Sequence, residues 1–471
     1  MKRSKRILSL VAILAVACVA TFAVTKYEQK QEEIKNSDAI ILELPADTVQ
    51  SLSWDYTDSG LSFHRGEEGW LYDEDEAFPV SEEKIAEILS YFEAFGVSFI
   101  IENVEDYSQY GLDKPECVIH LTTTDQSYEL KLGSFSKMDE QRYVDIGDGN
   151  VYLVNKDPMD YLETELSGMI LHDETPSFEK VNEIQFTGSE NYTIAYIEES
   201  KDTYCEEDVF FSPGDGKKLP LDTSAVNTYL NTISSLSLQN YVTYNATSEE
   251  LQSYGMENPE LSVTVDYTYT DEEKQELSDT CVLYISSNPE ELAAAKEAEE
   301  KKEETIPEVT RYVRVGDSQI VYELDEAVYD VLAAASYNDL RHKEVIWADF
   351  EDITQIDIDL EGVSHSLTVV GGEDKDDTVW YYGEEEIDIQ NLKNALENLT
   401  ADSFTDETSD QKEEIALTIH LDNESFPQVS IRLFRYDGSL CLAAVDGESV
   451  SFVNRPAVMK LVEAVQAIVL N

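Results

Sequence analysis

The sequence predicts an α+β protein: three related units of antiparallel strands and hairpins, each with an amphipathic helix, after one N-terminal transmembrane helix. An apolar run behind a basic N-terminus, a helix pattern that occurs three times, and alternating apolar and polar residues after each helix lead to this prediction. In order, a cytoplasmic basic flank, a transmembrane anchor and three repeat units, the third divergent, are expected at residues 1–6, 7–24, 38–177, 178–346 and 347–471.

Length and composition bound the class of protein. A chain of 471 residues has room for about three domains of roughly 150 residues each. Hydrophobic residues make up 42% and aromatic residues 10%, so the chain can form real cores and general disorder is excluded. The net charge of −65 repels phosphate backbones, which argues against nucleic acid as a partner. Cationic partners and divalent ions fit this charge, but we interpret it mainly as a solvated acidic surface.

The N-terminus has the pattern of a membrane anchor. Four basic residues in "MKRSKR" precede "ILSLVAILAVACVATFAV", an uncharged run of 18 residues. Such a run spans about 30 Å of hydrocarbon at 1.5 Å per residue, and the basic flank is expected to stay in the cytoplasm. The chain would then cross the cell membrane once, and the part after the anchor would lie outside the cytoplasm.

Two other interpretations of this segment remain open. In a cleaved signal peptide, a small-residue site would follow a shorter apolar core, and "TFAVT" fits such a site poorly. In a lipoprotein signal, Cys18 of "AVAC" would be acylated, but the apolar run continues past it to Val24. We therefore favour an uncleaved anchor.

A helix with one apolar face is predicted three times, each with apolar residues at i, i+3, i+4 and i+7. The three faces are Ile85, Ile88, Leu89 and Phe92; Val226, Tyr229, Leu230 and Ile233; and Leu392, Ala395, Leu396 and Leu399. The expected N-caps are Ser81, Asp222 and Asp388.

Strand patterns follow each helix. "PECVIHLTTTDQSYELKLG" and "PELSVTVDYTYTDEEKQELSDTCVLYIS" predict antiparallel pairs. "RYVDIGDGNVYLV", "RYVRVGDSQIVYEL" and "LAAVDGESVSFV" predict hairpins, with turns at Gly147-Asp148, Gly316-Asp317 and Asp446-Gly447.

A turn motif occurs twice, as "YGLDKP" at residues 110–115 and "YGMENP" at 254–259. We interpret both copies as structural turns rather than catalytic loops, formed by Tyr110, Gly111, Pro115, Tyr254, Gly255 and Pro259. Asn103 with Asp106, and Thr247 with Glu250, are expected to start short helices that the glycines end in a left-handed conformation. Each proline would precede a strand, where its missing N–H does no harm, and each tyrosine ring would cover its turn. The third unit reads "TDETSDQKEE" instead.

These motifs resemble the family called domain of unknown function 4340. The similarity rests on "GWLYDEDEAFPVSEEKIAEILSYFEAF", "YGLDKP", "LKLG" and "RYVDIGDGNVYLV", and residues 178–346 resemble the family too. The second copy has Met256 in place of Leu112, and the third unit departs furthest. The resemblance implies an extracytoplasmic bacterial protein without an established activity, and some relatives are associated with transporter-like assemblies of the gliding-motility auxiliary type.

Motifs of catalytic chemistry were sought independently. We find no GxSxG, HExxH, Walker loop, GxGxxG after a strand, or zinc-like Cys/His cluster, so no catalytic, cofactor or metal residue is assigned. His120 in "VIHL" matches His420 in "TIHL". His172 with Glu174, and His342 with Glu344, recur near unit ends, and we interpret these pairs as junction residues rather than a metal site.

The cysteines form no CxxC or close pair. Cys117, Cys281 and Cys441 fall in strand-like runs where a free buried thiol is the ordinary outcome, whereas Cys205 does not. Disulfides among these four residues remain open.

A charged insertion, residues 287–309, interrupts the second unit where the first has only "SFSKMDEQ". Its Ala, Glu and Lys content predicts an exposed helix or a mobile charged loop without an apolar face. We interpret it as a tolerated surface extension, with a docking element for a partner as the alternative.

Together these features predict a membrane-anchored, extracytoplasmic, non-catalytic structural or accessory binding protein of the bacterial cell surface. An extracytoplasmic accessory subunit of a transporter-like complex is the alternative, and a wall-directed hydrolase is less favoured. Expected partners are membrane or cell-surface proteins, with membrane contact through residues 7–24 and no cofactor. Ligand and oligomeric state are left open by the sequence.

Overall fold

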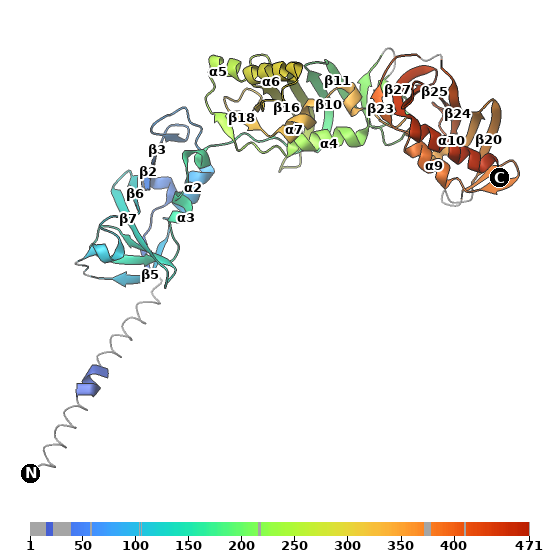
Figure 1. Ribbon diagram of the computed structural model, residues 1–471. Helices are drawn as coiled ribbons and strands as arrows, with labels where there is room; N and C mark the ends of the chain where they lie inside the picture. Colours follow the sequence, from blue (N-terminus) through green and yellow to red (C-terminus); the bar gives the residue numbers. More distant parts are fainter. Residues whose placement is uncertain are drawn as a thin grey trace, which may run out of the picture. The chain divides into compact units, whose positions relative to one another are not determined.

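The computed structural model describes residues 16–21, 39–56, 59–102, 104, 106–214, 218–371, 378–408 and 411–470. The chain divides into two compact units between His172 and Asp173. One nine-stranded antiparallel sheet belongs to the N-terminal unit and two belong to the C-terminal unit (Figure 1). The α+β class with three similar units is therefore confirmed.

The predicted anchor at residues 7–24 lies outside the described residues except for 16–21, which are helical. Within the described part of the chain, no helix combines the length and the apolar character needed to cross a membrane.

The first sheet has the strand order β1-β5-β9-β8-β7-β6-β2-β3-β4. Its strands are β1 Ala39–Leu42, β2 Val49–Tyr56, β3 Ser59–Arg65, β4 Trp70–Tyr72, β5 Phe95–Ile101, β6 Cys117–Thr123, β7 Ser127–Ser136, β8 Gln141–Asp145 and β9 Val151–Val154.

The second sheet has the order β13-β12-β11-β10-β15-β16-β17-β18-β14. Its strands are β10 Lys180–Thr187, β11 Tyr192–Tyr196, β12 Phe210–Pro213, β13 Lys218–Pro220, β14 Tyr241–Thr243, β15 Leu261–Thr270, β16 Glu276–Ser287, β17 Arg311–Val315 and β18 Val321–Leu324.

The third sheet has the order β22-β21-β20-β19-β24-β25-β26-β27-β23. Its strands are β19 Ile353–Leu360, β20 Val363–Val370, β21 Val379–Tyr382, β22 Glu385–Ile387, β23 Ala401–Phe404, β24 Glu413–Leu421, β25 Gln428–Arg435, β26 Leu440–Val445 and β27 Glu448–Asn454.

The second and third sheets share one topology, although the third lacks the turn motif. Numbered within each sheet, both read 4-3-2-1-6-7-8-9-5. The first sheet differs at its edges: β1 is added beside β5, and among the described residues β4 ends the other edge without a counterpart of β13 or β22. One antiparallel pair in each sheet shifts register at the same place. These pairs are β2 with β6, β10 with β15 and β19 with β24, and the shifts follow Val49, Val181 and Ile353.

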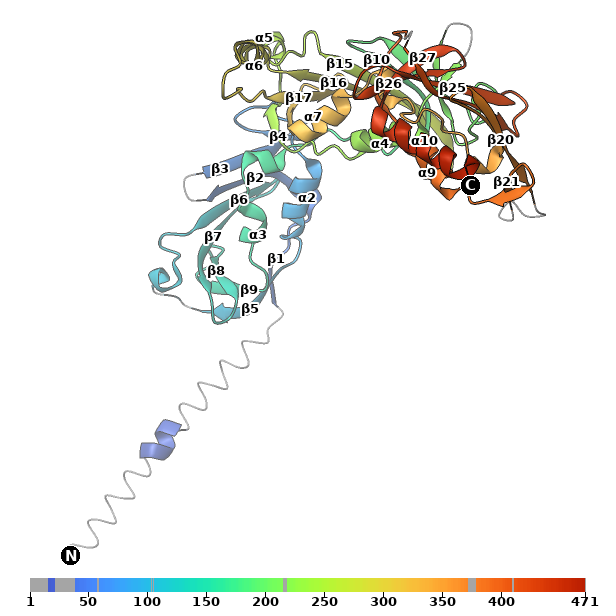
Figure 2. The same cartoon turned by 45° about the vertical axis from the view of Figure 1, so that its right-hand side comes forward.

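Two helices accompany each sheet. The three expected amphipathic helices are α2 Glu82–Ser90, α4 Thr223–Ser234 and α9 Gln390–Glu397. The helices that close the repeats are α3 Met159–Leu162, α7 Glu326–Ala333 and α10 Arg455–Val469. They pair as α2 with α3, α4 with α7, and α9 with α10 (Figure 2). The predicted apolar faces are buried, except that Ala395 is only partly so.

Two of the three predicted N-caps are confirmed. The Ser81 hydroxyl accepts the Lys84 N–H, and the Asp222 carboxylate accepts the N–H groups of Ser224 and Ala225. The prediction for Asp388 was wrong, because α9 begins one residue later, with Ile389 at the N-cap. The Asp388 carboxylate still accepts the Gln390 N–H, so it serves the same helix end from one position upstream.

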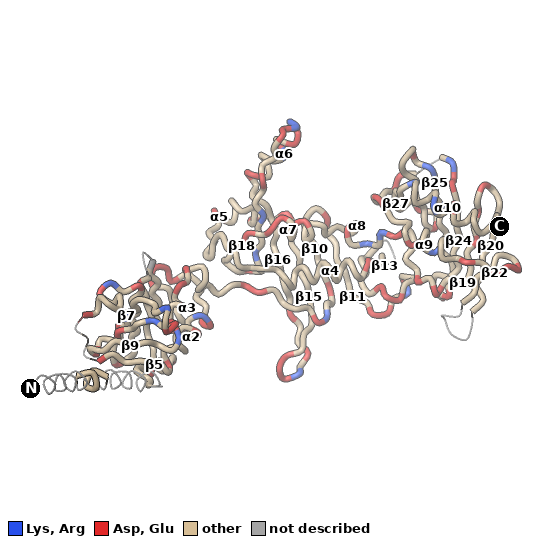
Figure 3. Tube along the Cα trace, turned by 60° about the horizontal axis from the view of Figure 1, so that its bottom comes forward, with Lys and Arg blue, Asp and Glu red and all other residues tan. Residues whose placement is uncertain are grey.

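The charged insertion forms α6, Pro289–Lys301, capped by the Asn288 side chain. It projects from the second sheet with acidic and basic residues toward its end (Figure 3). The prediction that it buries no apolar face was wrong in part, because Ala295 and Ala298 are buried. A stripe of small alanines was not recognised as a packing face. The Glu291 carboxylate also accepts the Thr310 N–H at 2.7 Å, which ties the helix to the start of β17.

Candidate functional site

The repeated turn motif follows a short helix in both copies. The first helix is the 3₁₀ segment Tyr107–Tyr110, where the Asp106 carboxylate accepts the Ser108 N–H at 2.9 Å. Asn103 lies outside the described residues. The second helix is α5, Ser248–Ser253, which begins with a capping box between Thr247 and Glu250.

Both glycines of the motif occupy positions that a side chain does not fit. Gly111 has φ of 71° and Gly255 has φ of 72°, the left-handed conformation that ends a helix. A Cβ at Gly111 would lie 2.9 Å from the Ser134 backbone nitrogen, and one at Gly255 would lie 2.8 Å from the Ser287 carbonyl oxygen. Conformation and close approach therefore both require glycine.

The tyrosine ring of each motif packs on a tyrosine of the equivalent strand, β8 in the first sheet and β17 in the second. The rings of Tyr110 and Tyr143 are 4.9 Å apart, and those of Tyr254 and Tyr312 are also 4.9 Å apart. Pro115 and Pro259 each stand two residues before a strand, β6 and β15. The motif thus holds a short helix against the sheet, and its groups make no convergent polar site.

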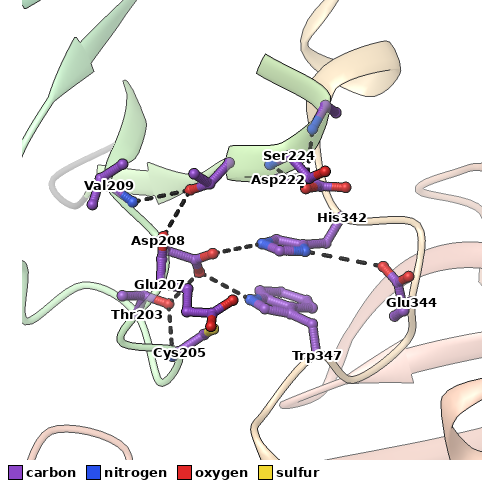
Figure 4. Close-up of polar contacts among 12 residues, drawn as sticks. Thr203, Cys205, Glu207, Asp208, Val209, Asp222, Ser224, His342, Glu344 and Trp347 are labelled. Atoms are coloured by element: carbon purple, nitrogen blue, oxygen red, sulfur yellow. Dashed lines mark hydrogen bonds and ion pairs between the residues drawn. The ribbon is translucent and has the colours of Figure 1, made fainter. Parts of the chain in front are cut away.

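A second group of polar residues lines a cleft of about 820 Å³ in the C-terminal unit. Its walls come from the loop before β12, the first turns of α4, the linker at residues 342–348, and Glu397 of α9. The second and third repeats therefore both contribute to it. Figure 4 shows the polar contacts at the centre of this junction cleft.

Asp208 is the centre of these contacts, with only 2% of its side chain exposed. One carboxylate oxygen accepts the Thr203 hydroxyl at 2.6 Å and the Trp347 indole N–H at 3.1 Å. The other oxygen lies 2.8 Å from His342 Nε2. A buried carboxylate with three partners is well satisfied, which offsets the cost of removing it from water.

His342 is held from several sides. Its Nδ1 lies 4.0 Å from a carboxylate oxygen of Glu344. Its ring stacks on the indole of Trp347, with centroids 4.5 Å apart and planes 7° apart. Tyr204, from the same loop as Asp208, also packs on that indole at 4.8 Å. The histidine is therefore oriented by contacts with both repeats.

A histidine oriented by a carboxylate is an arrangement suited to general base catalysis when a nucleophile lies within reach. Cys205 is the thiol among the described residues lining the cleft. Burial, with a further contribution from the Asp208 charge, raises the pKa of this thiol to about 11, so it is protonated at neutral pH. Thr223 is also engaged, because its hydroxyl accepts the Val209 N–H and donates to the Glu207 carbonyl.

The charge around the cleft has one sign. Its described lining includes the carboxylates of Glu207, Asp208, Asp222, Glu344 and Glu397, and neither lysine nor arginine. The resulting field attracts cations. Across the part of the chain that the structure describes, however, no group of three or more His, Cys, Asp or Glu side chains is arranged to hold a metal ion.

His172 and Glu174, the pair predicted at the first junction, do not lie in the same compact unit. His172 is the last residue of the N-terminal unit, whereas Glu174 belongs to the C-terminal unit. Between them in the sequence, Asp173 accepts hydrogen bonds from the Ser318 hydroxyl at 2.6 Å and the Tyr322 hydroxyl at 3.1 Å. This junction sequence is thus used to contact the second sheet.

The sequence match between His120 and His420 does not correspond to equivalent positions. We align the two sheets at their register shifts, after Val49 in β2 and after Ile353 in β19. His120 pairs with Ser53, and the residue equivalent to Ser53 is Asp357, which pairs with Thr418. His420 therefore lies two residues further along its strand than the position equivalent to His120. Because side chains alternate between the two faces of a sheet, both histidines lie on the same face.

The sequence pointed to His342 and Glu344 but missed Thr203, Tyr204, Asp208 and Trp347. A weak signal was present, because "HKEVIWADF" is two residues longer than "HDETPSF" at the equivalent junction. Cys117, Cys205, Cys281 and Cys441 are all free, so the structure contains no disulfide between these described residues.

Comparison with known proteins supports the repeat. The model of the family described as domain of unknown function (DUF4340) matches residues 70–210 and 214–418. The first match runs from β4 to β12 and the second reaches β24, so the matched segments are offset from the sheets. No curated protein and no solved structure matches the chain. Because the two matches cover well over half of its 471 residues, the chain belongs to the DUF4340 family.

Proposed function

We propose that this chain is a membrane-anchored, extracytoplasmic protein of the bacterial cell surface that acts as a structural or accessory binding module rather than as an enzyme. The observation that carries the proposal is the state of the polar groups at the junction cleft. Asp208 orients His342, but neither Thr223 nor Cys205 beside this pair is an activated nucleophile: the Thr223 hydroxyl donates to the Glu207 carbonyl, and burial raises the pKa of the Cys205 thiol to about 11. Such contacts are typical of a joint between repeats.

The sequence supports the location. The four basic residues before the 18-residue apolar run favour an anchor whose C-terminal side faces away from the cytoplasm. The abundant acidic residues are distributed over all three sheets (Figure 3), which suits a solvated surface.

Protease accessibility tests the location. In intact cells with a permeabilised or removed wall, added protease should digest the part after residue 38 and leave cytoplasmic proteins untouched. A variant with Lys2, Arg3, Lys5 and Arg6 replaced by Asn is the matched control, because it removes the charge asymmetry and should lower the accessible fraction. Full-length protein found soluble in the cytoplasm would overturn the proposal.

Affinity capture of the full-length chain from solubilised membranes tests the binding role. A reproducible membrane or cell-surface partner would support it. Turnover of wall material by the purified chain, lost in His342→Ala, would instead favour a hydrolase and contradict a non-catalytic role.

A role as accessory subunit of a transporter-like membrane complex is the second candidate. The chain belongs to the DUF4340 family, and the resemblance to this family implies an association of some members with assemblies of the gliding-motility auxiliary type. Co-purification of transporter-like membrane proteins in the same capture experiment would select this candidate over a free-standing surface module.

A further inference from the structure

One connection differs strongly in length between the first two sheets. β3 ends at Arg65 and β4 begins at Trp70, whereas β11 ends at Tyr196 and β12 begins at Phe210. When the added strand β1 is set aside, both connections join the second strand of the sheet to the third, and both lead to a buried aromatic residue. The connection at residues 197–209 is therefore an extended form of the one at 66–69.

The extended connection places an aromatic ring in the core of the next repeat. Tyr204 is only 7% exposed, and it belongs to the hydrophobic cluster that the third sheet forms with α9 and α10. Its ring packs near Phe426 at 5.8 Å as well as on Trp347. A side chain from the second repeat thus completes the core of the third.

The same connection also contacts the linker between the second and third repeats. Asp208 contacts His342 and Trp347, which lie in the linker at residues 342–348. The backbone at this joint is also bound on both sides: just before the linker the Asp222 N–H donates to the Leu340 carbonyl, and within the linker the Val345 N–H donates to the Leu399 carbonyl. Side-chain and backbone contacts therefore act at the same joint.

We propose that residues 197–209 form an intramolecular clasp that makes the second and third sheets open as one cooperative unit. Without Tyr204 and Asp208, the third core would lose a buried ring and the linker would lose its buried polar partner. Each sheet would then open at its own stability. The clasp is a device of this second junction, since the first sheet has only the short connection.

The chain contains a thiol reporter in each sheet. Cys117, Cys281 and Cys441 lie in the first, second and third sheets, and each is buried. Because they are buried, an alkylating reagent reaches them only when their sheet opens, and the same burial raises their pKa values to about 12, 11 and 11 respectively, which further slows their reaction at pH 8.

The test is pulse alkylation of the full-length chain, purified in a mild detergent, along a urea titration at pH 8. Mass spectrometry of the cysteine-containing peptides gives an opening midpoint for each thiol. In the unmodified chain, Cys281 and Cys441 should share one midpoint, with Cys117 as an internal reference. Separate midpoints in the unmodified chain would overturn the proposal.

The variant Tyr204→Ala with Asp208→Asn should split the shared midpoint, with Cys441 becoming reactive at the lower urea concentration because the third core loses the ring. If both midpoints instead shifted together, the two sheets would still be coupled without these two side chains, and that result would refute the clasp. Tyr204→Phe, which keeps the ring, should retain the shared midpoint.

Two further variants keep the test decisive. If the double variant does not fold, Tyr204→Leu alone gives the same comparison with a smaller loss of packing. Glu68→Gln is the matched control: Glu68 stands two residues before Trp70, as Asp208 stands two before Phe210, and it is exposed. This control should leave all three midpoints unchanged, and a split of the Cys281 and Cys441 midpoints in it would contradict the assignment.

Discussion

The connections at residues 66–69 and 197–209 occupy the same place in two related sheets, and the longer one reaches beyond its own sheet. The short connection returns directly to β4, while the long one supplies Tyr204 and Asp208 to the neighbouring repeat. Loop length costs little in closure entropy, so a repeat tolerates an extension at this position. The difference shows how a change confined to a surface connection alters which sheets are joined.

A second difference lies inside the sheets. In the first, Arg142 is buried and paired with Asp157 and Glu116 at 2.7 and 2.6 Å. In the second, the matching Arg311 of the "RYV" strand lies over the ring of Tyr329, 4.1 Å from its centroid. The same position is thus stabilised by ion pairs in one sheet and by a cation–π contact in the other.

The largest expected effect comes from breaking the ion pairs of the first sheet. Asp157→Ala removes a carboxylate that is 13% exposed and leaves Arg142, 8% exposed, with one acidic partner. Removing one member of a buried pair typically costs about 3 kcal/mol of unfolding free energy. The alkylation midpoint of Cys117 should fall, and those of Cys281 and Cys441 should not. Glu129→Ala, at an exposed pair with Lys131, is the control and should cost less than about 1 kcal/mol.

The turn motif provides a comparison in which both repeats should respond alike. Gly111→Val and Gly255→Val should each destabilise their own sheet by about 1 kcal/mol or more, because a β-branched residue fits a left-handed backbone poorly and its Cβ would meet the neighbouring backbone. Urea melts of both variants measure this. Gly316→Asn is the control: its φ is 47°, nothing lies near its Cβ position, and asparagine tolerates this conformation. Unchanged stability in both valine variants would refute a structural turn.

The smallest effect is expected from removing α6. Deleting residues 288–308 and joining the flanks with a short Gly-Ser turn removes two buried alanines and the bond from Thr310 to Glu291. We expect a loss of about 1 kcal/mol or less, because the change in closure entropy is weak. Thermal unfolding monitored by circular dichroism measures this loss of stability. A large loss of cooperativity would place α6 in the core of the second repeat, whereas weaker partner capture with an intact fold would identify a docking element.

Periodicity made most of the fold predictable. The spacing of Ile85 and Leu89 and its two repetitions located the helices, and the glycines at residues 111 and 255 marked where short helices end. Local signals of this kind depend on neighbours in sequence. The N-cap of α9 fell one residue from its predicted position because Asp388 reaches the helix end from outside it.

The junction cleft was not predictable in the same way. Asp208 lies in a connection without apolar periodicity, and its partners His342 and Trp347 are 134 and 139 residues away. No pattern within a window of the sequence records such a pairing. Tyr204 was equally hidden, since nothing in "KDTYCEEDV" separates an aromatic residue destined for a distant core from one that remains on the surface.

The edge strand β1 gives the first sheet a mechanical property. It has four residues, β5 is its one partner in the sheet, and its register shifts between Ile40 and Leu42. Tension applied at the N-terminal end of the sheet would meet this strand first and peel it away, since few hydrogen bonds hold it. The remaining strands would keep their own pairings, and each freed residue would add roughly 3.3 Å to the extended chain before the sheet. A sheet built in this way yields at its margin and absorbs a pull before its core is disturbed.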